Sequence, residues 1–213
     1  MMRGDIIIVE DHHRRAAETI VAAFADRVRG AGRTFTVTVA GESGCGKSET
    51  GKALQEAFET AGLPAVVLQQ DDYFVLPPKS NDRRRREDIS WVGLGEVRLD
   101  LLNEHLRAAR KGAPSITKPL VVYEEDRIEE EVLSLEGVKV VIAEGTYTTT
   151  LDEADIHVFI DRDYHATLPA RKRRAREAFD PFIEEVLEIE HGIIAPQKEL
   201  AEVVISNDYA VSL

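Results

Sequence analysis

The stretch Gly41-Glu42-Ser43-Gly44-Cys45-Gly46-Lys47-Ser48 decides how this chain should fold. It follows an apolar, β-branched run at 34–40 and precedes a helix-forming stretch from Glu49 to Thr60. A glycine-rich turn between a strand and a helix can direct its backbone N–H groups at phosphate oxygens, and the start of the helix adds partial positive charge. The spacing is that of a phosphate-binding loop. The segment therefore predicts binding of a nucleoside triphosphate together with Mg²⁺.

Two side chains at the end of this loop suit a magnesium nucleotide. Lys47 would place a positive charge against the β and γ phosphates, and the hydroxyl of Ser48 would be a ligand of Mg²⁺, a hard cation that prefers oxygen. Cys45, the single cysteine of the chain, is expected to pack as a small residue in the turn. A glycine-rich turn without a ligand is the alternative interpretation. The residues expected to bind the donor are Gly41, Ser43, Gly44, Cys45, Gly46, Lys47, Ser48 and Glu49.

The composition indicates one soluble domain. The chain has 213 residues and a formal net charge of −12, and this charge argues against general affinity for nucleic acid, whose phosphates it would repel. Every apolar run is shorter than the roughly 20 residues that cross a bilayer. One cysteine cannot form an internal disulfide, which fits a reducing compartment. We therefore expect a cytoplasmic protein with neither nucleic acid nor membrane as a partner; the sequence neither requires nor excludes an oligomer.

Apolar runs that alternate with amphipathic stretches predict a parallel sheet. The runs are short and rich in β-branched residues, as in a sheet built from strand–helix–strand crossovers. The predicted strands comprise residues 34–40, 65–68, 138–143, 156–160 and 203–205, with a short pair at 119–123 and 129–133. Helices are predicted at about 11–29, 47–61 and 97–109. The fold class that follows is α/β, a P-loop NTPase fold with a doubly wound, mainly parallel sheet flanked by helices and a small helical lid.

Carboxylates stand where two of the predicted strands end. Asp71 and Asp72 follow the strand 65–68, and Glu144 follows the nearly continuous apolar strand 138–143. Ligands of open α/β sheets bind beyond the carboxyl ends of the strands, so these side chains should converge with the loop. Asp71 is the candidate to accept the proton of an alcohol in phosphoryl transfer, with Asp72 as the alternative, and Glu144 is the candidate to hold Mg²⁺. Solvated turn residues and a helix-turn cap are the structural alternatives.

Three segments lie outside the core pattern of the single domain expected over residues 1–213. Residues 1–32 form a leading helix, and about 75–96 are polar, proline-bearing and arginine-rich, which indicates an excursion on the acceptor side. Residues from about 164 to 190 are mostly helical with an interruption at Pro181, and we expect a lid there.

Two arginine-rich runs need separate interpretations. The run from Arg171 to Arg176 is expected to close over the transferring phosphoryl group, with Arg171 and Arg174 as the catalytic candidates beside Lys47. A solvated helix face is the alternative. The run Arg83 to Arg86 is either a solvated loop or a clamp for an anionic acceptor.

The chain resembles the uridine kinase and phosphoribulokinase family of P-loop kinases. The resemblance extends from about Thr34 to Asn207 and rests on an ordered series of motifs. These are the loop from Gly41 to Ser48, the phrase Leu68-Gln69-Gln70-Asp71-Asp72-Tyr73-Phe74, the segment Pro119 to Tyr123, the phrase Val141-Ile142-Ala143-Glu144-Gly145, the arginine-rich helix, and the segment Ala195 to Ile205. The resemblance implies that Asp71 is the catalytic base and that Glu144 helps hold magnesium. It also makes Asp72, Tyr73 and Tyr123 candidate substrate-binding residues.

The chain departs from uridine kinases on the acceptor side. Gly93 stands at the place of the aspartate that holds the ribose hydroxyls, and Glu96 is the only acid nearby. No histidine follows Tyr123, and Glu177-Ala178-Phe179-Asp180 replaces the second basic motif of the lid. Recognition of a pyrimidine nucleoside is therefore not evident from the residues.

The sequence as a whole predicts a kinase that uses ATP and Mg²⁺ to phosphorylate a small-molecule alcohol. Uridine or cytidine is the leading named acceptor by resemblance, and another metabolite alcohol or a sugar phosphate is the alternative. ATP rather than GTP is a default, since no motif reads the base. A nucleotide-dependent switch and a nucleotide-binding module without turnover are the rival classes, and a carboxylate placed to accept an alcohol proton argues against the switch.

Overall fold

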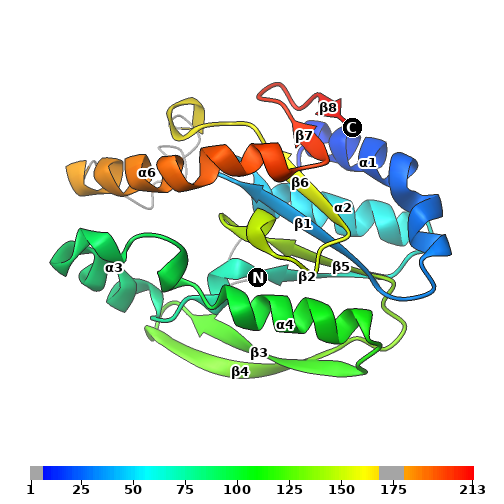
Figure 1. Ribbon diagram of the computed structural model, residues 1–213, viewed down its shortest axis with the longest axis horizontal. Coiled ribbons are helices and arrows are strands. Elements are labelled where there is room, and N and C mark those ends of the chain that lie inside the picture. Colours follow the sequence, from blue (N-terminus) through cyan, green and yellow to red (C-terminus); the bar gives the residue numbers. More distant parts are fainter. Residues whose placement is uncertain (1–6, 168–179) are drawn as a thin grey trace.

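A six-stranded sheet forms the centre of the protein (Figure 1). The computed structural model describes residues 7–167 and 180–213. The strand order is β2-β5-β1-β6-β7-β8, and all neighbours are parallel except β7 and β8. The mainly parallel arrangement confirms the predicted fold class, while the very short β8 was not predicted. The strands are Phe35–Gly41 (β1), Ala65–Gln69 (β2), Val140–Glu144 (β5), Ile156–Ile160 (β6), Val203–Ile205 (β7) and Val211–Ser212 (β8).

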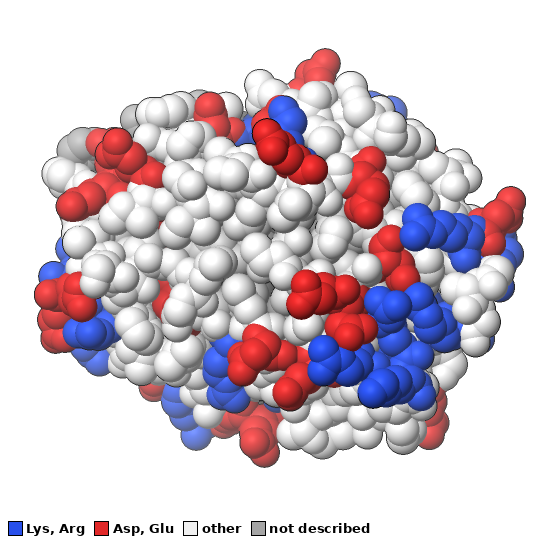
Figure 2. All heavy atoms as spheres, in the orientation of Figure 1, with Lys and Arg blue, Asp and Glu red and all other residues white. Residues whose placement is uncertain are grey.

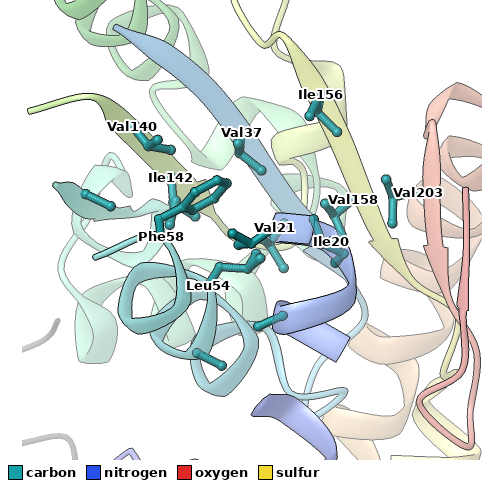
Figure 3. Packing of buried hydrophobic residues seen from close by; sticks show 14 of the residues in the cluster. Ile20, Val21, Val37, Leu54, Phe58, Val140, Ile142, Ile156, Val158 and Val203 are labelled. Atoms are coloured by element: carbon teal, nitrogen blue, oxygen red, sulfur yellow. The ribbon is translucent and has the colours of Figure 1, made fainter. Parts of the chain in front are cut away.

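One face of the sheet is covered by α1 (Asp11–Gly30) and α2 (Lys47–Thr60), both close to their predicted bounds. Alternate residues of a strand point to opposite faces, so Val37 and Val39 of β1 pack against these helices. Burial of each large apolar side chain contributes about 1.5–3 kcal/mol, so this layer is a major source of stability. The cluster in Figure 3 includes Ile20, Val21, Leu54, Phe58, Ile142, Val158 and Val203.

The opposite face packs against α4 (Leu99–Arg110) and the end of α6 (Pro181–Ile194). Leu102, Leu106 and Ala109 recur at helical spacing and form the buried stripe of α4. Because helices cover both faces, β1 and β5 are buried along their whole length, which explains their near-continuous apolar sequences.

A separate two-stranded antiparallel sheet lies beside α4, opposite the central sheet (Figure 1). Its strands are Ser115–Val122 (β3) and Arg127–Ser134 (β4), both longer than the predicted pair. One aspartate attaches the hairpin to the core: Asp72 Oδ2 lies 2.7 Å from Lys118 Nζ, and Asp72 Oδ1 accepts the N–H of Val121 at 3.0 Å. All three residues are buried, so the contact fixes where the hairpin sits.

The polar stretch predicted as an excursion contains a helix, α3 (Pro78–Glu87), and two short 3-10 turns, Ile89–Trp91 and Leu94–Glu96. Proline is tolerated in the first turn of a helix because the N–H groups there have no acceptor within the helix, so a residue without an N–H loses no hydrogen bond. Asp126, at the tip of the hairpin, accepts the backbone N–H groups of Lys79 and Ser80 at 2.7 and 3.2 Å. The hairpin tip thus caps α3, and the two elements hold each other.

The expected lid is only partly visible. Residues 168–179, which include Arg171 and Arg174, lie outside the described residues. After them α6 begins at Pro181, where the sequence predicts an interruption. Within residues 7–167 and 180–213, no helix combines the length and the apolar character needed to cross a bilayer.

The ends of β2 and β5 approach closely because Gly145 has no side chain. A Cβ atom on Gly145 would lie 2.2 Å from the Cβ of Gln70 and 2.8 Å from its Oε1. Gln70 begins the 3-10 turn Gln70–Tyr73 after β2, and its Oε1 accepts the N–H of Tyr147 at 2.7 Å. The close approach brings the carboxylates that follow the two strands to the same place.

We expect Gly145→Ala to destabilise the protein by about 2–3 kcal/mol, because the added methyl group would overlap Gln70. Urea unfolding measures this cost. Gly192→Ala is the matched control: nothing lies within 4 Å of its added Cβ, and alanine in a helix should stabilise by up to about 1 kcal/mol. Equal stability of Gly145→Ala and the wild type would show that the strand ends separate freely.

Candidate active site

The glycine-rich loop joins β1 to α2 with the backbone that its sequence predicts. Gly44 has a φ of 76° and Gly46 a φ of 102°, both in the left-handed region that favours glycine. Gly46 immediately precedes α2. The first N–H groups of a helix have no partner within the helix, so this loop presents them at the carboxyl end of β1.

Lys47 and Ser48 open α2 and point to different partners. Lys47 Nζ donates to the backbone oxygen of Glu42 at 2.9 Å, and Ser48 Oγ donates to Oε1 of Glu144 at 3.1 Å. Burial alone would lower the pKa of Lys47, but the negative charges of Glu144 and Asp71 help to raise it above its ordinary value. Lys47 therefore stays protonated, as a phosphate-binding lysine must.

Glu144 ends β5 as a buried carboxylate, 4% exposed. Burial raises the pKa of Glu144 to about 7, and the negative charge of Asp71 adds to the shift, while Lys47 and the hydrogen bonds from Ser48 and Gln69 oppose it. A divalent cation would relieve this repulsion. The hydroxyl of Ser48 and the two carboxylates are the oxygen ligands that Mg²⁺ prefers, so these residues fit the ion.

Asp71 and Asp72 are neighbours in the chain but face different surroundings. Asp71 is exposed on the 3-10 turn after β2, near Glu144 and Lys47. Asp72 is fully buried and bonded to the β3–β4 hairpin. Tyr73 is also fully buried, and its hydroxyl lies 2.8 Å from Nδ1 of His105. These contacts correct the expectation that Asp72 and Tyr73 bind the acceptor, because protein encloses both side chains.

Two other predicted residues have clear surroundings. Tyr123, at the hairpin tip, is 47% exposed, with the ammonium group of Lys79 5.6 Å from its ring centroid. It remains a candidate for contact with the acceptor. Cys45 is fully buried, and burial raises the pKa of its thiol, in keeping with a packed and unreactive side chain. Glu49 is buried in the first turn of α2.

Glu42 is a functional candidate that the sequence did not single out, because it occupies a variable position of the loop pattern. Its Oε2 accepts the N–H of Tyr164 at 2.7 Å, and its Oε1 lies 2.6 Å from Nδ1 of His191 on α6. Glu42 thus connects the loop to α6 and to the segment after β6. Beside it lies a hollow of about 350 Å³ whose lining includes Glu42, Ile160, Arg162, Asp163, His191 and Asn207.

The four arginines of α3 each have a carboxylate partner, and Arg83 and Arg86 stay exposed and Arg84 partly so, so the run is a solvated helix with ion pairs rather than a loop. On the face drawn in Figure 2, basic and acidic side chains likewise lie next to one another. The partners are Asp126 for Arg83, Asp88 for Arg84, Glu96 and Glu190 for Arg85, and Asp82 and Asp180 for Arg86.

Arg85 makes the most buried of these contacts. It lies 2.7 Å from Glu96, which is fully buried, and 3.0 Å from Glu190 of α6. Glu96 also accepts from Asn81 Nδ2 at 2.9 Å and from the N–H of Gly93 at 3.1 Å. Glu96, the acid that follows the position of the family's ribose-binding aspartate in the sequence, is therefore fully engaged within the protein.

A glycine-rich loop with a protonated lysine, next to a serine and two carboxylates at the ends of parallel strands, is the arrangement expected of a P-loop kinase. Comparison with known sequences agrees: the profile of the Phosphoribulokinase / Uridine kinase family matches residues 36–207. The chain belongs to this family, and it is a kinase that phosphorylates an alcohol group.

Individual relatives of this chain are also named as kinases. The chain is 31% identical over 189 residues to a bifunctional alpha-galactosidase/sucrose kinase of Mediterraneibacter gnavus; the match covers 82% of this chain but 20% of that protein. It is 23% identical over 185 residues to a uridine kinase of Leuconostoc citreum, covering 81% of this chain and 87% of that one.

Among solved structures, the fold is similar to a putative fructose transport system kinase from Silicibacter sp., with a TM-score of 0.63, 18% identity, and coverage of 87% of this chain and 94% of that one. A possible uridine kinase from Bacillus stearothermophilus gives a TM-score of 0.61 at 17% identity, covering 89% and 97%. At such identities the likeness concerns the fold alone.

We expect Glu144→Gln to make the magnesium-free protein more stable at neutral pH. The pKa of Glu144 is raised from 4.5 to about 7 in the folded protein, so the charge is tolerated less well after folding. The wild type should lose stability relative to the variant as the pH rises from 4.5 to 7, by about 2–3 kcal/mol in total.

Urea unfolding between pH 4 and 8, with and without Mg²⁺ and ATP, measures this difference. With both present the order should reverse, since only the wild type offers the cation this carboxylate. Parallel pH curves for the two proteins would contradict the raised pKa of Glu144.

Proposed function

We propose that this protein transfers the γ phosphate of ATP, with Mg²⁺, to a hydroxyl group of a neutral sugar or related polyol. The observation that carries the kinase chemistry is the grouping of Lys47, Ser48, Glu144 and Asp71 at the carboxyl ends of neighbouring strands. The choice of a neutral acceptor rests on the side chains that are missing at Gly93 and after Tyr123, and on the carboxylate partners of the α3 arginines.

The donor end of the reaction belongs to the loop and α2. The loop amides and Lys47 would bind the β and γ phosphates, and Ser48 and Glu144 would hold Mg²⁺. The ion, when bound, neutralises charge on the phosphate oxygens. Lys47 supports the same task because its pKa is raised and its ammonium group keeps its proton.

Asp71 would accept the proton of the acceptor hydroxyl. It is exposed, so an acceptor can reach it, and its charge is felt by both Lys47 and Glu144, so it lies close to the donor phosphates. As the hydroxyl oxygen bonds to the γ phosphorus, the bond to the bridging oxygen of ADP breaks and ADP leaves with the electron pair. The proton moves to Asp71.

The nucleoside part of the donor would occupy the hollow of about 350 Å³ beside the loop. The hollow lies at the ends of β6 and β7 and is bordered by Glu42, which joins it directly to the phosphate-binding loop. Arg162 offers a planar cation for contact with a base, and Asn207 offers a polar side chain at the rim. Arg171 and Arg174 remain our candidates for closing over the γ phosphate.

A neutral sugar suits the acceptor side better than a nucleoside or a sugar phosphate. Gly93 lacks the carboxylate that holds ribose in uridine kinases, and the stretch after Tyr123 lacks the histidine that meets the pyrimidine base. Glu96 and Arg85 neutralise each other, and each of the other arginines of α3 already has a carboxylate partner, so a phosphate would have to compete with those partners. The 31% identity to a protein named in part a sucrose kinase supports the same choice.

We expect release of ADP from ATP and Mg²⁺ to be stimulated by a sugar such as fructose or sucrose, and not by uridine, cytidine or a sugar phosphate. Asp71→Asn should lower the stimulated rate about 10²–10⁴-fold, because the amide cannot accept the proton. A coupled assay for ADP over this panel measures both effects.

Glu87→Gln is the matched control, because it removes the same charge from an exposed position on α3 and should leave the rate unchanged. Stimulation by uridine alone would show that the acceptor is a nucleoside rather than a sugar. Turnover that no acceptor stimulates and that Asp71→Asn leaves unchanged would contradict a kinase and favour a nucleotide switch.

A further inference from the structure

Tyr209 lies against the back of the phosphate-binding loop, far from the loop in sequence. It belongs to the turn between β7 and β8, in which its N–H donates to the oxygen of Ser206 at 2.9 Å. Its ring packs against His12 and His13 of α1, with centroids 4.0 and 4.9 Å apart, and the guanidinium of Arg162 lies 5.2 Å from its centroid. The first helix, the end of β6 and the last turn of the chain therefore meet under the loop.

The hydroxyl of Tyr209 has three partners, and chemistry fixes the direction of each bond. Arg162 NH1, at 2.8 Å, can only donate. Nδ1 of His13 accepts the N–H of Glu10 at 3.1 Å, so Nε2 of the neutral ring carries the proton and donates to Tyr209 at 3.1 Å. The remaining partner, the carbonyl oxygen of Cys45 at 3.2 Å, can only accept. Tyr209 must therefore donate its own proton to the loop.

This bond orients a peptide group of the loop. In a trans peptide the C=O and the next N–H point in opposite directions. Holding the carbonyl of Cys45 toward Tyr209 turns the N–H of Gly46 away from it, to the side where a phosphate would bind. Arg162 NH1 also reaches the same carbonyl, at 3.5 Å.

The packing around Gly46 leaves this arrangement little freedom. A Cβ atom on Gly46 would lie 2.6 Å from Oη of Tyr209 and 3.1 Å from Nε2 of His13. Tyr209 itself has a φ of 63°, a left-handed backbone that costs a tyrosine roughly 1 kcal/mol or more. Strain of this kind persists where the surrounding contacts fix a side chain in place.

We infer that Tyr209 is a positioning residue for phosphate binding: it fixes the Cys45–Gly46 peptide so that the loop presents its N–H to the donor. Burial raises the pKa of Tyr209 above its ordinary value of 10, with Arg162 opposing, so the hydroxyl keeps the proton it donates. The inference rests on the proposed binding of a nucleoside triphosphate by the loop. It adds a residue that never touches the nucleotide.

Tyr209→Phe tests this, because it removes the hydroxyl and keeps the ring. We expect the dissociation constant for inorganic tripolyphosphate with Mg²⁺, measured by titration calorimetry, to rise about 10-fold. The KM for ATP should rise by a similar factor while the KM for the acceptor does not change. His13→Leu, which removes one donor to Tyr209, should weaken binding about 3-fold, and His13→Gln, which keeps an N–H, should weaken it less.

Asp208→Asn is the control, because Asp208 is exposed in the same turn and bonds only to Ser206 and its neighbours among the interactions described. It should bind tripolyphosphate like the wild type. If Tyr209→Phe lowers thermal stability but binds tripolyphosphate normally, or if both KM values rise together, Tyr209 is merely structural and the inference is wrong. If the wild type itself does not bind tripolyphosphate, the proposed binding of a nucleoside triphosphate by the loop is wrong, and so is the inference that rests on it.

Discussion

The burial of a carboxylate beside a second negative charge is the constraint on which the site depends. Glu144 is buried at the end of β5, and Asp71 approaches it from the turn after β2; burial first and the negative charge of Asp71 second disfavour the charge of Glu144. Gly145 allows this approach, and Lys47 and Ser48 only partly offset it. A divalent cation bound with its nucleotide would remove this unfavourable interaction, and the energy so recovered would add to the affinity of the site for its ligands.

The proposed acceptor side differs, since the arginines of α3 already have carboxylate partners within the protein. Arg85 joins α3 to Glu96 and to Glu190 of α6, and Asp126 caps α3 from the hairpin tip. Exposed ion pairs contribute little, but the buried pair of Arg85 and Glu96 is costly to break because either partner would be left alone in a desolvated place. Polar contacts therefore join α3 to the hairpin tip and to α6, whereas apolar contacts join the sheet to its helices.

The sequence predicted the sheet, the loop and the carboxylates after β2 and β5, because β-branched runs and the glycine spacing are local signals. It did not predict α3, whose sequence lacks an apolar stripe and which is held by ion pairs and by Asp126, 39 residues beyond its end. It favoured Asp71 over Asp72 as the proton acceptor but could not show that Asp72 is buried, since Lys118, the partner of Asp72, is 46 residues away. Tyr209 was missed for the same reason: it meets Cys45 across 164 residues, and no pattern in the chain connects them.

The adjacency of Asp71 and Asp72 gives the fold a division of labour within a single dipeptide. Asp71 is exposed where we propose that phosphoryl transfer occurs, and Asp72 anchors the hairpin through Lys118 and the backbone of Val121. Under the proposed function, the hairpin tip can change its side chains, and with them the molecule it accepts, while the root of the hairpin stays attached next to the proposed proton acceptor. An architecture of this kind lets a lineage explore new substrates without rebuilding the chemistry that acts on them.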